Sequence, residues 1–131
     1  MGIFNNLFSN KDTNSEEKKD QPVWIPLTSE DQLIEIEQNS SNRPQIIFKH
    51  STTCGISSMV LRSFKNSYSL EDNQADLYFL DLRRYRDVSN EVANRFKVYH
   101  QSPQVLIIKN GTAVANESHG GITSLNLSRY I

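Results

Sequence analysis

Residues 46–57 read Ile-Ile-Phe-Lys-His-Ser-Thr-Thr-Cys-Gly-Ile-Ser. The apolar start, Ile46-Ile47-Phe48, is typical of a central strand that is covered on both faces. The next segment, 55–65, has the pattern of a helix, so Cys54 stands at a strand-to-helix junction. A helix N-terminus offers unpaired N–H groups and a partial positive charge, which stabilise an anion such as a thiolate. Because the thiolate is the reactive form of cysteine, this position indicates a reactive thiol as readily as its alternative, a buried and inert cysteine.

The helix after Cys54 is expected to have Thr53 as its N-cap, because a threonine hydroxyl accepts hydrogen bonds from the first turn. Polar residues from Asn66 onward end the helical pattern. Apolar residues one or two turns apart predict a buried stripe of Ile56, Met59, Val60 and Phe64.

The rest of the chain alternates short apolar runs with segments of helical periodicity. The run near Trp24 lies between two prolines, which confine it to a strand edge or start. Thr28 with Asp31 resembles a capping box, and Asn110-Gly111 is a hairpin signal. The expected fold is α/β, a central mixed sheet of about five strands with helices on both faces. The strands are expected near 23–27, 46–48, 77–82, 105–108 and 112–117, and the helices near 28–38, 55–65, 88–96 and 123–131.

The composition suits one domain. The chain has 131 residues, 37% of them hydrophobic and 22% charged, with a net charge of −1. The domain is expected over 22–131, after a flexible N-terminal segment, 1–21, whose polar part offers little to bury. The charge balance gives no reason to expect nucleic acid as a partner, and no stretch approaches the roughly 20 apolar residues of a membrane span.

Cysteine and histidine usage limits the chemistry further. One cysteine cannot form an internal disulfide, and His50, His100 and His119 lack the spacing of zinc ligands. A thiol without a partner suits a reducing compartment, so a cytoplasmic location is expected. Residues 1–8 lack the basic start and long apolar core of a signal peptide, and they fit either a frayed terminus or a short docking element.

Three loops should meet at the carboxyl edge of the parallel strands: residues 51–54, the segment after Leu82, and residues 100–103. Element order, the cysteine before the second helix and the proline before the fourth strand make the domain similar to the thioredoxin superfamily. In that superfamily the proline is cis, faces the cysteine and lies in backbone that receives an extended substrate like an added strand. The resemblance gives this substrate-binding role to Ser102 and Pro103.

The local motif narrows the resemblance. Thr53-Cys54-Gly55-Ile56-Ser57 is similar to the Thr-Cys-Pro-Ile-Ser motif of the YtxJ-type monothiol bacilliredoxins, thioredoxin-fold proteins of bacteria that use bacillithiol in place of glutathione. The resemblance implies that Cys54 is catalytic, with Thr53, Gly55, Ile56 and Ser57 as supporting residues. Gly55 departs from the family's proline and adds backbone freedom at the helix start. Ser57 stands where thioredoxins have a second cysteine, so Cys54 lacks an internal resolving thiol.

The implied reaction is thiol–disulfide exchange, in which the Cys54 thiolate takes bacillithiol from a bacillithiolated client protein. Bacillithiol is then a thiol co-substrate, and no bound cofactor or metal is expected. Ser57 is placed to hydrogen-bond the sulfur, and the alternative is a plain early-helix serine. Arg83-Arg84-Tyr85-Arg86 offers guanidinium groups to the carboxylates of bacillithiol, although a solvated basic turn is the commoner meaning of such a run.

Other functions stay open at this point. A thioredoxin-fold adaptor or redox sensor would carry Cys54 as a modification site, and a structural domain would bury it as an inert thiol. Gly120-Gly121 is expected either to flank the cysteine before the last helix or to form an ordinary turn. Trp24 is expected to cover either the core or the cleft, and the three histidines are given no catalytic role.

Overall fold

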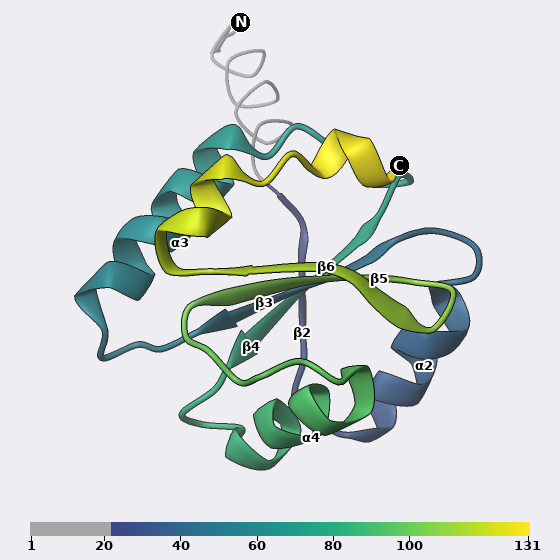
Figure 1. Ribbon diagram of the computed structural model, residues 1–131, viewed down its shortest axis with the longest axis horizontal. Helices are drawn as coiled ribbons and strands as arrows, with labels where there is room; N and C mark the ends of the chain where they lie inside the picture. Colours follow the sequence, from purple (N-terminus) through teal and green to yellow (C-terminus); the bar gives the residue numbers. More distant parts are fainter. Residues whose placement is uncertain (1–21) are drawn as a thin grey trace, which may run out of the picture.

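The computed structural model describes residues 22–131, and the expectations for residues 1–21 lie outside this part of the chain. Its centre is a five-stranded sheet with the order β2-β4-β3-β5-β6 (Figure 1). β4 pairs parallel with β2 and β3, whereas β5 pairs antiparallel with β3 and β6. The expected mixed sheet is thus confirmed. Its strands are β2 (Trp24–Pro26), β3 (Gln45–His50), β4 (Asp76–Asp81), β5 (Gln104–Lys109) and β6 (Thr112–Ser118).

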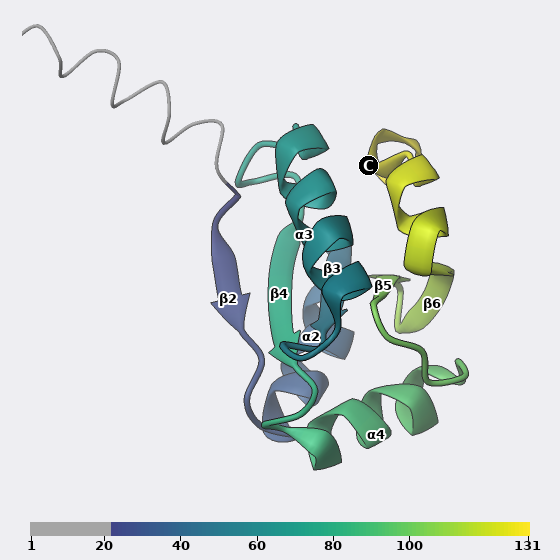
Figure 2. The ribbon, with the colours of Figure 1, turned by 90° about the vertical axis from the view of Figure 1, so that its left-hand side faces the viewer.

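Helices cover both faces of this sheet, as expected (Figures 1 and 2). Helices α2 and α4 share one core cluster with the sheet, and α3 shares the other with the C-terminal segment. Within the described residues, no helix has both the length and the apolar character needed to cross a membrane. The α-helices are α2 (Asp31–Asn39), α3 (Gly55–Ser67) and α4 (Arg86–Phe96).

Strand β3 lies between the two core clusters, and all six of its residues are buried. Ile47 packs in the cluster with α2 and α4, whereas Ile46 and Phe48 belong to the cluster of α3. This alternation follows from the two-residue period of a strand. The ring of Trp24 lies with its centroid 6.1 Å from those of Phe48 and Phe64, so the indole covers the core on the α3 face.

The end of the chain differs from the expected helix over 123–131. It forms two 3-10 helices, η1 (His119–Ser124) and η2 (Leu127–Tyr130), separated by extended backbone. The side chain of Asn126 accepts a hydrogen bond from Ser128 N at 3.2 Å, which starts a new turn where a helix would have continued. Short polar side chains of this kind compete with the helical ladder, and here they interrupt it.

The start of α2 also differs from the expectation. The helix begins at Asp31, and no capping box forms between Thr28 and Asp31. Gln32 supplies the acceptor instead, because its Oε1 receives hydrogen bonds from Thr28 N at 2.7 Å and Ser29 N at 3.1 Å. The side chain that reaches back to the residues before the helix is thus that of Gln32, one residue after the expected Asp31.

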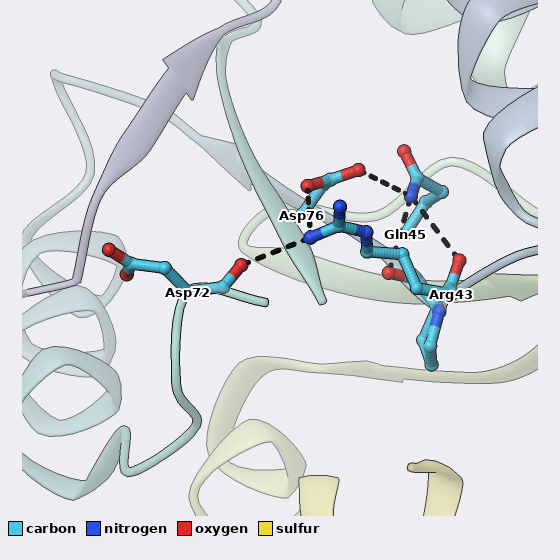
Figure 3. A network of polar contacts seen from close by, with 5 residues as sticks. Arg43, Gln45, Asp72 and Asp76 are labelled. Carbon is cyan, nitrogen blue, oxygen red and sulfur yellow. Dashed lines mark hydrogen bonds and ion pairs between the residues drawn. The ribbon is translucent and has the colours of Figure 1, made fainter. Parts of the chain in front are cut away.

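A polar network lies at the end of the sheet where β3 and β4 begin (Figure 3). Gln45 is fully buried, and its Nε2 donates to Asp76 Oδ2 at 2.8 Å. Arg43 Nη1 lies 3.6 Å from Asp76 Oδ1 and donates to the backbone carbonyl of Asp72 at 3.2 Å. Asp76 therefore contacts both Arg43, which precedes β3, and Gln45, which begins it.

Asp76→Ala is expected to lower the free energy of unfolding by about 1–2 kcal/mol, because the buried Gln45 amide loses a charged acceptor. The reactivity of Cys54 should not change, since the network lies at the opposite end of β3. Urea denaturation measures the first effect. Asp72→Ala is the matched control, because Arg43 contacts its backbone carbonyl and not its side chain. An equal loss in both variants would contradict the assignment.

Candidate active site

The sheet register brings three loops to one edge, as the sequence predicts. Lys49 on β3 pairs with Leu80 on β4 and with Gln104 on β5, so the chain leaves β3, leaves β4 and enters β5 at the same end of the sheet. Leu82 N adds a hydrogen bond to the His50 carbonyl at 3.1 Å. Figure 2 shows the start of α3 and the segment after β4 at this end of the molecule. We call this end the active edge, and it comprises loops 51–54, 82–85 and 100–103.

Cys54 is the half-buried N-cap of α3. Its backbone is extended, its N–H donates to the Ser51 carbonyl at 3.2 Å, and its own carbonyl accepts from Ser58 N at 3.2 Å. Within the described part of the chain no side chain caps α3, so none there competes for the N–H groups of the first turn. An anion at the Cys54 sulfur is the kind of group that this helix end stabilises. The expected N-cap, Thr53, is wrong by one residue.

The hydroxyl of Thr53 is turned toward the loop after β4. It accepts a hydrogen bond from Arg83 Nη1 at 3.1 Å and lies 3.4 Å from Ser51 Oγ. The side chain of Arg83 is exposed, and within residues 22–131 it forms no ion pair with a carboxylate. Arg83 therefore reaches the residue next to Cys54 with most of its N–H groups free.

The other arginines of the same run have different surroundings. The guanidinium of Arg84 lies 5.6 Å from the ring centroid of Tyr85. Arg84 and Arg86 border a depression of about 470 Å³ whose rim also carries Glu30 and Asp31. Because acids and bases share that rim, the depression offers no preference for an anion. Arg83 is the member of the run that meets the loop of Cys54.

Ser57 is fully buried, and its hydroxyl is turned inward toward β3. Its Oγ lies 2.8 Å from His50 Nδ1 and accepts a hydrogen bond from Ser51 N at 3.1 Å. One hydroxyl thus joins the end of β3, the loop and the first turn of α3. No hydrogen bond connects this hydroxyl with the Cys54 sulfur in the described part of the chain, so the expected contact with the sulfur is absent.

The predicted buried stripe of α3 is wrong at two positions. Val60 and Phe64 are buried as expected, but Ile56 is 57% exposed and Met59 is 72% exposed. Ser57 takes the buried place in the first turn, since its partners on β3 and in the loop satisfy its hydroxyl. The two exposed side chains leave an apolar surface on the turn that follows Cys54.

His50 packs below this loop on the α3 face, with its ring centroid 5.5 Å from that of Phe79. Burial lowers the pKa of His50, Asp81 raises it and Lys65 lowers it further. Burial is the largest of these causes, so the imidazole stays neutral around pH 7. A neutral ring is the form that pairs with the Ser57 hydroxyl without adding a charge to the core.

The loop before β5 contains a cis peptide bond between Ser102 and Pro103, as the resemblance implied. The Pro103 carbonyl accepts from His119 N at 3.0 Å, and Gln101 N donates to the Gln104 side chain at 3.3 Å. Ser102 lies between these two bonded residues. Among the described residues its backbone forms no hydrogen bond, and its buried Oγ has no partner.

Sequence reasoning missed a buried lysine at this edge. Lys49 is fully buried on the α4 face of β3. Its Nζ donates to the Ser89 carbonyl at 3.2 Å and lies 3.2 Å from His100 Nδ1. The sequence did contain a signal for this. Lys49 directly follows the apolar run 46–48 and stands two residues after Ile47, so the two side chains point to the same face of the sheet.

Gly120-Gly121 lies inside η1, so it is neither a loop before a final helix nor a free turn. Gly55 is the first residue of α3, and an added Cβ there would meet nothing within 4 Å. Packing therefore does not require glycine at position 55, and the first helical position is one that proline also suits.

The family model for the monothiol bacilliredoxin BrxC matches residues 25–127. The chain belongs to the monothiol bacilliredoxin family. Cys54 is its only cysteine, so it is the one residue that can supply the family's single thiol.

Solved structures with a thioredoxin fold are similar to this chain. A protein described provisionally as an oxidoreductase with a thioredoxin fold is 32% identical, with a TM-score of 0.69, over 82% of this chain and 93% of its own. The Schistosoma mansoni thioredoxin pre-protein is 19% identical, with a TM-score of 0.64, over 84% and 100%. Fasciola hepatica thioredoxin is 17% identical, with a TM-score of 0.63, over 81% and 98%. The thioredoxin fold is therefore confirmed, and family and fold together point to thiol oxidoreductase activity.

Proposed function

We propose that this bacilliredoxin removes bacillithiol from protein mixed disulfides through Cys54. The observation that carries the proposal is a half-buried thiol at an uncapped helix start with no second thiol beside it. Such a thiol can form a mixed disulfide, but it cannot release itself internally. The substrate is therefore one in which a small thiol is transferred to the protein and later removed by another small thiol.

In the first step, the Cys54 thiolate attacks the bacillithiol sulfur of the client's mixed disulfide. The client–bacillithiol S–S bond breaks, a Cys54–bacillithiol S–S bond forms, and the client leaves as a thiolate that takes a proton from water. In the second step, the thiolate of another bacillithiol attacks the bacillithiol sulfur on Cys54. Cys54 is restored, and bacillithiol disulfide carries away the oxidising equivalents. A reductase system is an alternative donor for this step.

Bacillithiol acts in this scheme as a co-substrate, and no bound cofactor takes part in either step. The low-molecular-weight thiol must be present in reduced form, which is why we place the reaction in the cytoplasm. The apolar surface left by Ile56 and Met59 lies beside Cys54 and suits contact with a client protein.

The test is incubation with a bacillithiolated protein, followed by mass spectrometry of both proteins. The expected products are a client with a free thiol and a bacillithiol adduct on Cys54. Added bacillithiol should then remove the adduct and allow repeated turnover. A client that keeps its bacillithiol would refute the proposal.

A redox sensor is the second candidate, and the lack of a second cysteine favours it. Because Cys54 is the only cysteine, no internal thiol can release a modified Cys54. A sensor would accumulate the adduct and would not cycle with added bacillithiol. The turnover measurement therefore separates the two functions.

We further propose that Arg83 recognises the carboxylates of bacillithiol. Its bond to the Thr53 hydroxyl holds the guanidinium beside Cys54, and its remaining N–H groups match the two oxygens of a carboxylate. Arg83→Gln is expected to slow the reaction of Cys54 with bacillithiol disulfide about tenfold. The reaction with uncharged hydroxyethyl disulfide should change less than about twofold, since that reagent has no carboxylate to lose.

Arg84→Gln is the matched control, because Arg84 lies over Tyr85 and has no bond to the loop of Cys54. Stopped-flow kinetics of both variants with both disulfides give the comparison. If Arg83→Gln slows the two disulfides equally, Arg83 does not recognise a carboxylate.

A further inference from the structure

Lys49 is the feature of the active edge that the proposed reaction does not use. Its side chain has no exposed surface, and it leaves β3 toward α4. In the sheet its neighbours are Leu80 and Gln104, which are both uncharged. The ammonium group contacts a backbone carbonyl and a histidine ring, and it pairs with no carboxylate in the described residues.

A buried ammonium without a counter-charge opposes folding, because water solvates it better than the protein does. Burial accordingly lowers the pKa of Lys49 to about 8. An apolar residue of similar length is commonly tolerated at such a position, or even stabilises the fold. The stability of the sheet therefore gives no reason for a lysine at this position. The reason has to come from the groups that its Nζ contacts.

The Nζ joins three elements that meet at the active edge. It belongs to β3, it donates to the Ser89 carbonyl of α4, and it lies 3.2 Å from His100 Nδ1 in the loop before β5. An ammonium group only donates hydrogen bonds, so Nδ1 of His100 is the acceptor and the neutral ring carries its proton on Nε2. His100 stands two residues before Ser102, whose backbone is free of hydrogen bonds in the described chain.

We propose that Lys49 and His100 are positioning residues that hold the loop 100–103, so that the backbone of Ser102 can receive the chain of a client protein. The inference rests on the proposed function in one respect, namely that the substrate is a protein mixed disulfide. Gln101 and Pro103 are already bonded within the domain, whereas the N–H and C=O of Ser102 between them have no partner in the described residues. An extended chain pairs with a free backbone of this kind through main-chain hydrogen bonds.

The charges around this pair set its pH dependence. Burial, Lys49 and Arg86 all lower the pKa of His100, so its ring is neutral at pH 7 and Nδ1 stays an acceptor. Ser89 Oγ, also from α4, lies 3.4 Å from the same nitrogen. Lys49 is charged below about pH 8 and loses its charge above it. The charge-assisted bond to His100 then weakens, and the loop is held less firmly.

Stability should respond to pH in the opposite direction. The folded pKa of Lys49 is depressed, so between about pH 8 and pH 10.5, the ordinary pKa of lysine, the unfolded chain binds more protons than the folded chain. Lys49 therefore makes the folded state relatively more stable as pH rises through this range. As pH rises, the rate with a protein mixed disulfide should therefore fall relative to the rate with a small disulfide, while the contribution of Lys49 to stability rises. A lysine with a merely structural role would not produce these two opposite effects.

The experiment compares Lys49→Met with the wild type and with Lys109→Met, which removes a lysine from the opposite end of β5. Second-order rates are measured with a protein mixed disulfide and with hydroxyethyl disulfide. Their ratio cancels the thiolate fraction of Cys54 and reports on client docking alone. In the wild type the ratio should fall as pH rises through about 8. In Lys49→Met it should be about tenfold lower and independent of pH, as expected for the loss of a charge-assisted bond.

Urea denaturation of Lys49→Met should show stability equal to the wild type or above it, which separates docking from folding. His100→Ala should lower the ratio as Lys49→Met does, and His100→Asn should restore it, because Asn Oδ1 accepts in place of Nδ1. An unchanged ratio in Lys49→Met or His100→Ala would overturn the inference. If the wild type fails to react with the protein mixed disulfide at all, the proposed function fails instead.

Discussion

Cys54→Ala is expected to reduce the removal of bacillithiol from a client protein by about a thousandfold or more, to the uncatalysed background, since the only nucleophilic sulfur is lost. Cys54 is the half-buried N-cap of α3 and the only cysteine in the chain. Within residues 22–131 its sulfur forms no hydrogen bond and no disulfide. The variant should therefore fold normally, and its unfolding midpoint should stay close to that of the wild type. A discontinuous assay that follows the mass of the client gives the rate.

Ser58→Ala is the matched control for this variant, because Ser58 is exposed in the same turn of α3. Its rate should equal that of the wild type. A Cys54→Ala protein that still deprotects the client at the parent's rate would show that another group performs the chemistry, and the mechanism given above would be wrong.

Ser57→Cys is expected to convert the protein from a monothiol into a dithiol. Residues 54 and 57 lie one turn apart at the start of α3, a spacing at which helical side chains are neighbours. The new thiolate can attack the Cys54 sulfur, form an internal disulfide and release bacillithiol without any added thiol. The persistent adduct of the wild type should therefore be replaced by an oxidised dithiol of lower mass, and mass spectrometry of the intact protein distinguishes the two.

This variant also has a cost in stability. The Ser57 hydroxyl bonds to His50 Nδ1 and Ser51 N, and a sulfur atom is a poorer partner for both. We expect a loss of about 1–2 kcal/mol in the free energy of unfolding. Ser63→Cys on the same helix is the control, because position 63 lies nine positions from Cys54, roughly 13 Å along the helix axis. A persistent adduct in Ser57→Cys would mean that the buried slot at position 57 excludes the reaction.

Much of the fold could be predicted because the strands have strong local signals. Ile46-Ile47-Phe48 reads as a doubly covered strand, and β3 is indeed buried on both faces. Asn110-Gly111 marks the turn between β5 and β6, where both residues adopt positive φ. The convergence of three loops followed from strand direction alone. These features depend on residues close together in the chain, which is why periodicity and turn chemistry suffice for them.

The first turn of α3 was harder to predict, because side-chain type was a misleading guide there. Ile56 and Met59 are apolar and exposed, whereas Ser57 is polar and buried. The reason is a partner that local pattern does not contain: His50 reaches Ser57 from β3 and satisfies its hydroxyl. Sequence periodicity depends on the positions of apolar residues, so it cannot predict the burial of a polar side chain whose hydrogen-bond partners lie on another element.

The pair formed by Lys49 and His100 shows the same limit over a longer range. The two residues are 51 positions apart, and they meet only when α4 closes over the end of β3. His100 was left without a role because a single histidine in a loop is usually a surface residue. The helix expected at the end of the chain was wrong for a different reason, because the Asn126 side chain accepts a hydrogen bond from Ser128 N and starts a new turn.

Strand β3 places Lys49 and His50 on opposite faces. Lys49 contacts His100 in the loop 100–103, and His50 contacts Ser57 in the first turn of α3. A slip of one residue in the pairing of β3 would exchange the two faces, and both attachments would be lost together. Each molecule that folds with the correct register of β3 therefore also forms a complete active edge. A partly misfolded preparation should contain fewer active molecules, each working at the full rate, and active-site titration of the thiol would count them.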